Sequence, residues 1–199
     1  MDAPAATSQP FAESTPVGLL GLAIGCAALT PIAFGVSLTP EALRTAAWFC
    51  LLFGAGGQLL AGLMALANKN LLGGTLFTTF AFNWVMNWWA LSELAGGHVP
   101  DASVLFAVDV CFLVIFVVLT YAFGFYSKLL VAFLADIDLL YALRIARELA
   151  HTRALNVPIA LCTVALGVLA LWIAFALLVN PAAGRVVFPM PGPLFRRRA

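Results

Sequence analysis

The sequence is poor in charged residues. Of its 199 residues, 10% are charged and 63% are hydrophobic, whereas a soluble domain is roughly 25% charged and 45–50% apolar. Too few polar side chains remain to cover a surface that faces water, so lipid must cover part of it. This excludes a soluble enzyme and a disordered tail. The net charge is +1, and no basic excess points to a nucleic-acid partner.

Clusters of metal-binding or nucleophilic residues are also missing. No CxxC and no Cys/His group is present, because the cysteines stand singly in apolar runs: Cys26, Cys50, Cys111 and Cys162. A zinc site or a disulfide framework is therefore not expected, and small buried hydrophobic side chains are the simplest interpretation. His98 and His151 are isolated, and no nucleophile elbow or phosphate loop occurs. We expect no enzymatic activity, no metal and no cofactor.

Long apolar runs are what the sequence does contain. A helix needs about 20 apolar residues to cross the hydrocarbon core of a bilayer. Six stretches come close to or exceed this length: 16–38, 42–67, 71–94, 103–125, 129–145 and 157–179. The connections between them carry Pro, Gly, Asn and Asp, as loops do. We predict an all-α, polytopic membrane protein with three parts: a flexible segment 1–15, a six-helix transmembrane domain 16–180 and a Pro/Arg-rich cytoplasmic tail 181–199.

The basic residues predict the orientation. With six spans, both termini lie on the same side as the second and fourth loops. That side holds six Lys and Arg residues: Lys69, Lys128, Arg185, Arg196, Arg197 and Arg198. The other side holds four: Arg44, Arg144, Arg147 and Arg153. The positive-inside rule therefore places both termini in the cytoplasm of a multi-pass protein of the plasma (inner) membrane.

Four sequence motifs appear in order along the chain. They are TPVGLLG at 15–21, GGQLLAG at 56–62, NLLGGTLFTTF at 70–80 followed by Trp84, and GRVVFP at 184–189 followed by Gly192-Pro193. The first resembles the second half of NPAPLGLxG, and the others resemble GGxxQxxAG, GNTFGxTAFxSYGxFW and GRTVLPxGP. These are motifs of the acetate uptake transporter family, of which the chain is identified as a remote member.

The resemblance implies a hexamer of six-helix protomers, each with its own narrow path. Members of the family carry acetate and other small monocarboxylates, linked to protons. The hydrophobic constriction of the family falls here on Leu22, Phe80 and Ile137. Phe80 replaces a tyrosine and so lacks a hydroxyl that could bond a carboxylate. The signature motif at the pore mouth falls on Glu13, Ser14, Thr15, Pro16 and Gly18, where Glu13 replaces Asn and Ser14 replaces Pro.

Span three carries a possible polar stripe. Asn83 and Asn87 are four residues apart beside Thr79. This stripe could bind a carboxylate or amide, or form interhelical hydrogen bonds. We interpret Trp84, in the same span, as an anchor at the membrane interface, together with Trp88 and Trp89.

Three carboxylates lie inside predicted spans, where ionisable groups are costly. Asp136 and Asp138 flank Ile137 and diverge by about 160° on a helix, and Asp109 lies in span four. Each either takes up a proton and couples it to transport, or forms a structural pair with Arg144, Arg147 or another chain. Arg144 itself could instead pair with Glu148, four residues later.

Three functions remain open from the sequence. The first is a permease or channel for acetate or another small monocarboxylate, coupled to protons. The second is a non-transporting structural or accessory subunit that keeps the fold within a larger membrane complex. The third is a channel for a small neutral solute such as urea. The expected partners are the lipid bilayer, a homohexamer of the chain, and small carboxylates with protons.

Overall fold

The computed structural model describes residues 10–196. The first nine residues of the predicted flexible segment and the last three of the predicted tail lie outside the described residues. Every regular element in the described part is helical: α1 (Thr15–Ala33), α2 (Pro40–Phe49), the π-helical η1 (Cys50–Ala55), α3 (Gly56–Ala67), α4 (Leu71–Ala95), α5 (Ala102–Phe123), α6 (Lys128–Leu149) and α7 (Asn156–Ala183). Because α2, η1 and α3 follow one another without a break, these elements form six rods. The prediction of an all-α, six-helix bundle is confirmed.

Polar side chains fix where several rods begin. Thr39, Asn70 and Asp101 each accept a hydrogen bond from the backbone N–H three residues later, which satisfies a donor that the first helical turn leaves free. The hydroxyl of Ser103 also donates to Asp101. These hydrogen bonds, that of Ser103 first, hold the pKa of the Asp101 carboxyl below its usual value. The predicted connections therefore double as helix caps.

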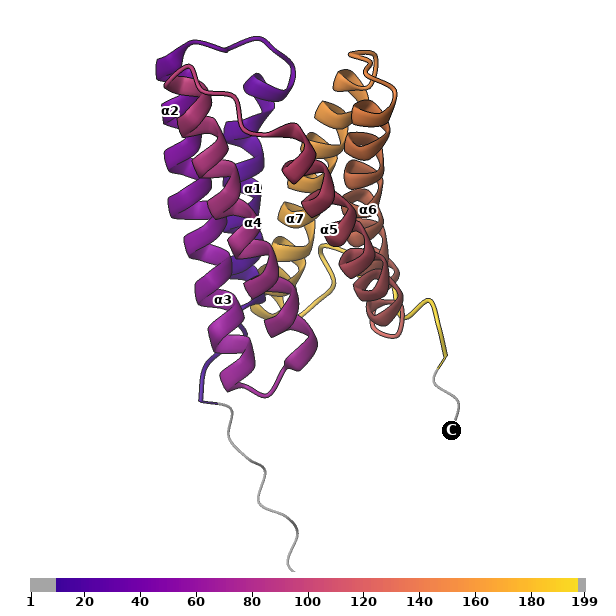
Figure 1. Ribbon diagram of the computed structural model, residues 1–199. Helices are drawn as coiled ribbons and strands as arrows, with labels where there is room; N and C mark the ends of the chain where they lie inside the picture. Colours follow the sequence, from indigo (N-terminus) through magenta and orange to yellow (C-terminus); the bar gives the residue numbers. More distant parts are fainter. Residues whose placement is uncertain (1–9, 197–199) are drawn as a thin grey trace, which may run out of the picture.

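The six rods alternate in direction (Figure 1). The connections 34–39, 96–101 and 150–155 lie at the upper end in Figure 1, and the connections 68–70 and 124–127 lie at the lower end. Residues 10 and 196 are both found at the lower end as well. In the bundle, α1 packs against α7 and α3, α4 packs against α2 and α3, and α6 packs against α5 and α7.

Two of the rods are less apolar than the other four. By length and composition, α1, the continuous rod Pro40–Ala67, α5 and α7 could each cross a membrane. Although α4 and α6 have 25 and 22 residues, they are not among these four candidates in the described part of the chain. They carry the amide stripe and most of the intramembrane charges. These two rods also supply much of the lining of an internal cavity.

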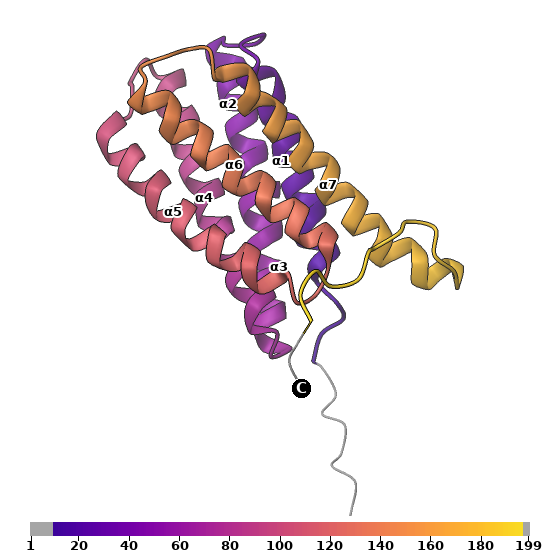
Figure 2. The same cartoon turned by 90° about the vertical axis from the view of Figure 1, so that its right-hand side faces the viewer.

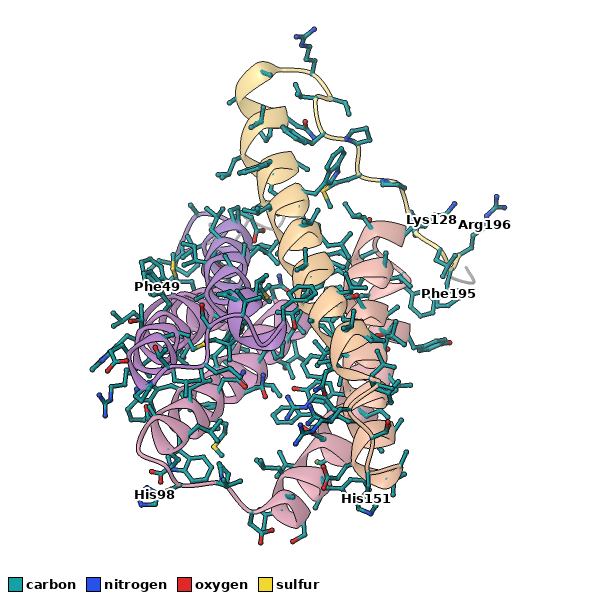
Figure 3. All side chains as sticks on the ribbon, turned by 90° about the horizontal axis from the view of Figure 1, so that it is seen from above. Phe49, His98, Lys128, His151, Phe195 and Arg196 are labelled. Atoms are coloured by element: carbon teal, nitrogen blue, oxygen red, sulfur yellow. The ribbon has the colours of Figure 1, made fainter. Side chains whose placement is uncertain are left out.

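The chain after α7 returns to the bundle (Figure 2). The side chain of Asn180 accepts hydrogen bonds from the backbone N–H groups of residues 187 and 188. Ser127 then donates to the carbonyl of Pro191 over 2.8 Å. The carbonyl of Gly124 accepts from residues 194 and 195, and Figure 3 shows Phe195 and Arg196 on the same side of the bundle as Lys128. The described part of the predicted tail is thus held against the α5–α6 connection.

Candidate functional site

A layer of apolar side chains crosses the middle of the bundle. Leu22 of α1, Phe80 of α4 and Ile137 of α6 are 0%, 5% and 1% exposed and belong to one buried cluster. The ring of Phe80 meets Phe116 of α5 edge-on, with 5.1 Å between centroids. The three residues that the family resemblance places at a constriction are therefore all buried inside the bundle. Apolar walls of this kind can close a path by excluding water.

Above this layer, toward the upper end in Figure 1, lies a small cavity of about 100 Å³, which we call the upper cavity. It is bounded by α1, α4, α6 and α7. Its lining is Cys26, Leu29, Phe80, Asn83, Trp84, Asn87, Ile137, Leu140, Tyr141, Arg144, Ile159, Thr163 and Leu166. Of the predicted polar stripe, Asn83 and Asn87 reach this cavity, and Thr79 is not part of the lining.

Below the layer lies a second cavity of about 180 Å³, which we call the lower cavity. Glu13 and Thr15 of the signature motif line it, together with Asn70 and with Met190 of the returning chain. Its remaining walls are mostly apolar and include Leu19, Leu76, Phe77, Phe133 and Ile173. Leu19, Phe77 and Phe133 belong to the same buried cluster as the apolar layer, and the upper and lower cavities share no lining residue in the described part of the chain.

The other residues of the signature motif hold α1 in place. Ser14 is buried and donates a hydrogen bond of 2.9 Å to the carbonyl of Ala61 in α3. Pro16 and Gly18 are buried in the first turn of α1. A Cβ at Gly18 would lie only 2.7 Å from the ring of Phe77. The motif thus contributes two side chains to the lower cavity and a close helix contact beside it.

Asp109 forms an ion pair with Arg144. The Nε of Arg144 donates to Oδ2 of Asp109 over 2.9 Å, joining α5 to α6. The guanidinium also lies 5.7 Å from the centre of the Tyr141 ring. Within the described residues Arg144 has no ion pair with Glu148, so of the pairings that the sequence left open the one with an intramembrane carboxylate is formed. The carboxylate on α5 competes successfully because it faces α6 directly.

Asp136 and Asp138 contact different helices. Asp136 accepts a hydrogen bond from the thiol of Cys162 on α7. Asp138 accepts a hydrogen bond of 2.7 Å from the hydroxyl of Thr120 on α5. Neither residue lines the upper or the lower cavity. In each carboxylate one oxygen, Oδ2 of Asp136 and Oδ1 of Asp138, is buried without a hydrogen-bond partner in the described structure. The two carboxylates therefore lie outside both cavities.

Trp84 is an inner wall of the upper cavity. It is 2% exposed, so its interpretation as an interfacial anchor is wrong. The indole fits between two glycines, since a Cβ at Gly25 or Gly54 would lie 2.8 or 2.5 Å from it. One helical turn separates Trp84 from Phe80, and this spacing could have placed it on the same face of α4.

Tyr141 and Arg144 are among the lining residues that the sequence did not single out for the path. They follow Ile137 by one and two helical turns, which puts all three on one face of α6. Two buried polar atoms of the upper cavity's lining residues, Nε1 of Trp84 and the hydroxyl oxygen of Tyr141, have no hydrogen-bond partner among residues 10–196. Such orphaned groups are uncommon in protein interiors. They make this cavity a candidate binding site.

Beyond Arg144 the bundle opens toward the 96–101 connection. A third cavity of about 260 Å³, the outer vestibule, is lined by Asp109, Arg144, Arg147 and Glu148 among mostly apolar residues of α4, α5 and their connection. Arg144 lines both this vestibule and the upper cavity. Within residues 10–196, no group of three or more His, Cys, Asp or Glu side chains could hold a metal ion.

These features define a polytopic membrane bundle with internal cavities on either side of an apolar layer. The fold is that of the bacterial acetate channel SatP, whose solved structure superposes with a TM-score of 0.81 and 22% identity over 90% of this chain and 99% of that chain. No protein-family model matches the sequence, and no curated protein matches it significantly. At this identity the likeness establishes the fold.

Proposed function

We propose that the chain provides a path across the membrane for acetate or a similarly small monocarboxylate. The observation that carries this proposal is the lining of the upper cavity. A guanidinium, two amide side chains, an indole and a phenol border the same small space. A carboxylate leaving water needs hydrogen-bond donors to replace its hydration, and this lining offers them beside an apolar layer.

The unpartnered groups favour an occupant that accepts hydrogen bonds. A buried donor without a partner costs about 1–3 kcal/mol, and both Trp84 and Tyr141 carry such a group. Carboxylate oxygens would satisfy them. A cavity of about 100 Å³ has room for a few water molecules or one short acid. The fold shared with an acetate channel supports the same class of solute.

For the path itself, we propose that Leu22, Phe80 and Ile137 form its closed constriction. A solute would leave the lower cavity, where Glu13 and Thr15 lie, and cross this layer to reach Asn83 and the upper cavity. Opening requires these apolar side chains to separate far enough for water to enter. The layer then acts as the gate of each protomer.

Asp136 is the group that we propose for proton linkage. Asp109 is engaged with Arg144, and Asp138 with Thr120. Asp136 and Asp138 each have one buried oxygen without a partner in the described structure, and both lie one residue from Ile137. Asp136 differs in its bonded oxygen, because the thiol of Cys162 is a weaker donor than the hydroxyl of Thr120. Proton uptake there would remove a buried charge beside Ile137 and so lower the electrostatic barrier to an anion.

We further propose that six copies assemble in the plasma membrane with both termini in the cytoplasm. The six-to-four distribution of basic residues supports this orientation, and the resemblance of the sequence motifs supports the hexamer. Native mass spectrometry of gently extracted membranes tests the assembly. A homohexamer is expected, whereas stable association with a larger complex would favour an accessory subunit.

The transport proposal is tested with purified protein in proteoliposomes. Uptake of labelled acetate, propionate and butyrate is measured with and without an inward proton gradient. Acetate uptake faster than in empty vesicles, and faster still with the gradient, is expected. Uptake equal to empty vesicles for every acid would refute the proposal. Urea flux that ignores the proton gradient, without acid flux, would instead show a channel for neutral solutes.

A further inference from the structure

Arg144 occupies the boundary between the outer vestibule and the upper cavity, since it lines both. It lies two helical turns above Ile137, or about 10 Å along α6. Among the described residues, Arg144 is the one that the linings of the two cavities share. Its side chain is 26% exposed, and that of Asp109 is 12% exposed, so the pair is largely shielded from solvent.

Most of the hydrogen-bonding capacity of this guanidinium is unused. Arginine has five N–H donors in a planar fork. Within residues 10–196 only the Nε donor is engaged, by Asp109. The four donors on the two Nη atoms have no protein partner there. The ring of Tyr141 lies 5.7 Å away and confines the guanidinium from one side.

We propose that the Nη donors of Arg144 bind the carboxylate of the passing solute while Asp109 holds the Nε edge in place. This inference rests on the proposed function and names its selective element. Arginine matches a carboxylate with two parallel hydrogen bonds. Tyr141 and the amides of Asn83 and Asn87, which line the same cavity, complete the shell. The site therefore selects a carboxylate over a neutral amide of the same shape.

Asp109 is a positioning residue in this scheme, and it also limits how tightly the solute binds. The ion pair is neutral overall, so a carboxylate meets hydrogen-bond donors without a full uncompensated positive charge. Conduction requires binding that is favourable enough for entry and weak enough for release. Removing the negative charge of Asp109 should thus lower both the KM and the maximal rate for acetate.

The test compares acetate with acetamide, its neutral isostere, in proteoliposomes. Arg144→Gln should slow acetate uptake about tenfold or more, because a charge-assisted contact is lost, and should change acetamide uptake far less. Acetamide uptake by this variant above that of empty vesicles shows that the path is intact. Asp109→Asn should lower KM and maximal rate together. Arg153→Gln, which removes a positive charge from the exposed 150–155 connection, is the matched control and should leave both solutes unaffected.

A second variant guards against misfolding. Removing one partner of a shielded ion pair is strongly destabilising, whereas replacing both is often tolerated. The double variant D109N/R144Q therefore carries the test if R144Q does not fold. Loss of acetate selectivity in the double variant supports the proposal. If the single or double variant carries acetate at the wild-type rate and selectivity, Arg144 does not bind the solute.

Failure of this inference is distinguishable from failure of the proposed function. If the wild-type protein carries no short acid at all, the proposed function is wrong and the inference falls with it. If the wild type carries acetate and the Arg144 variants do so equally well, the path exists and its selectivity lies elsewhere.

Discussion

The glycine at position 54 offers a sharp test of the wall of the upper cavity. A Cβ added there would lie 2.5 Å from Cδ2 of Trp84, whereas ordinary contact begins at 3.4 Å. In Gly54→Ala the indole must therefore retreat by about 0.9 Å, the difference between these distances. Gly25 on α1 approaches the same indole closely, and the upper cavity, which Trp84 lines, offers space into which the ring can move.

Overpacking of this kind costs about 1–3 kcal/mol. Gly54→Ala should accordingly lower the melting temperature of the purified protein. Because the displaced indole enters a cavity of about 100 Å³, initial acetate uptake should fall several-fold per folded protein. Gly56→Ala is the control, two residues away, where the new Cβ meets its nearest neighbour at an ordinary 3.6 Å.

Both readouts are needed to interpret the result. Gly56→Ala should match the wild type in melting temperature and uptake. A Gly54→Ala protein that melts at the wild-type temperature would refute the tight fit of Trp84. A destabilised Gly54→Ala protein with wild-type uptake per folded molecule would show that Trp84 does not border the path.

Three further predictions concern the gate, the proton and the tail. Phe80→Ala should cost about 3–5 kcal/mol of stability and raise butyrate uptake relative to acetate uptake. An unchanged ratio of butyrate to acetate uptake would contradict the place of Phe80 in the gate. Asp136→Asn should abolish the acceleration of acetate uptake by a proton gradient, whereas Asp138→Asn should retain it. The reverse pattern would exclude Asp136 as the group that links transport to protons. Phe195→Ala loses ring contacts with Tyr121 and Phe125, at 5.2 and 5.3 Å. Each contributes about 0.5–1.5 kcal/mol, so limited proteolysis of the tail should be roughly tenfold faster, and an unchanged rate would show that the ring does not hold the tail.

The bundle was predictable because long apolar runs and loop residues are local signals. The run 42–67 indicates one rod, and the structure has one, although a π-helical turn interrupts its α-helical pattern. The position of Leu22, Phe80 and Ile137 came from motif alignment, and all three are buried together. For these features, local sequence carries most of the information.

The rest depends on how the helices are rotated against one another. Asp109 and Arg144 are 35 residues apart on different rods, and only the packing of α5 on α6 brings them together. The spacing of Arg144 and Glu148 within one helix therefore could not decide between Glu148 and an intramembrane carboxylate as the partner of Arg144. Trp84 was misplaced because its slot is formed by glycines of two other rods, α1 and the α2–α3 rod.

The central claim is that a small carboxylate passes through the upper cavity beside Arg144. The most direct test is a pair of crystal structures of the protein, grown under matched conditions with sodium acetate and with sodium chloride. We expect difference density of the size of acetate in the upper cavity, near Asn83 and Arg144, that appears only with acetate. Acetate bound only outside this cavity, or the same density in both crystals, would contradict passage through it.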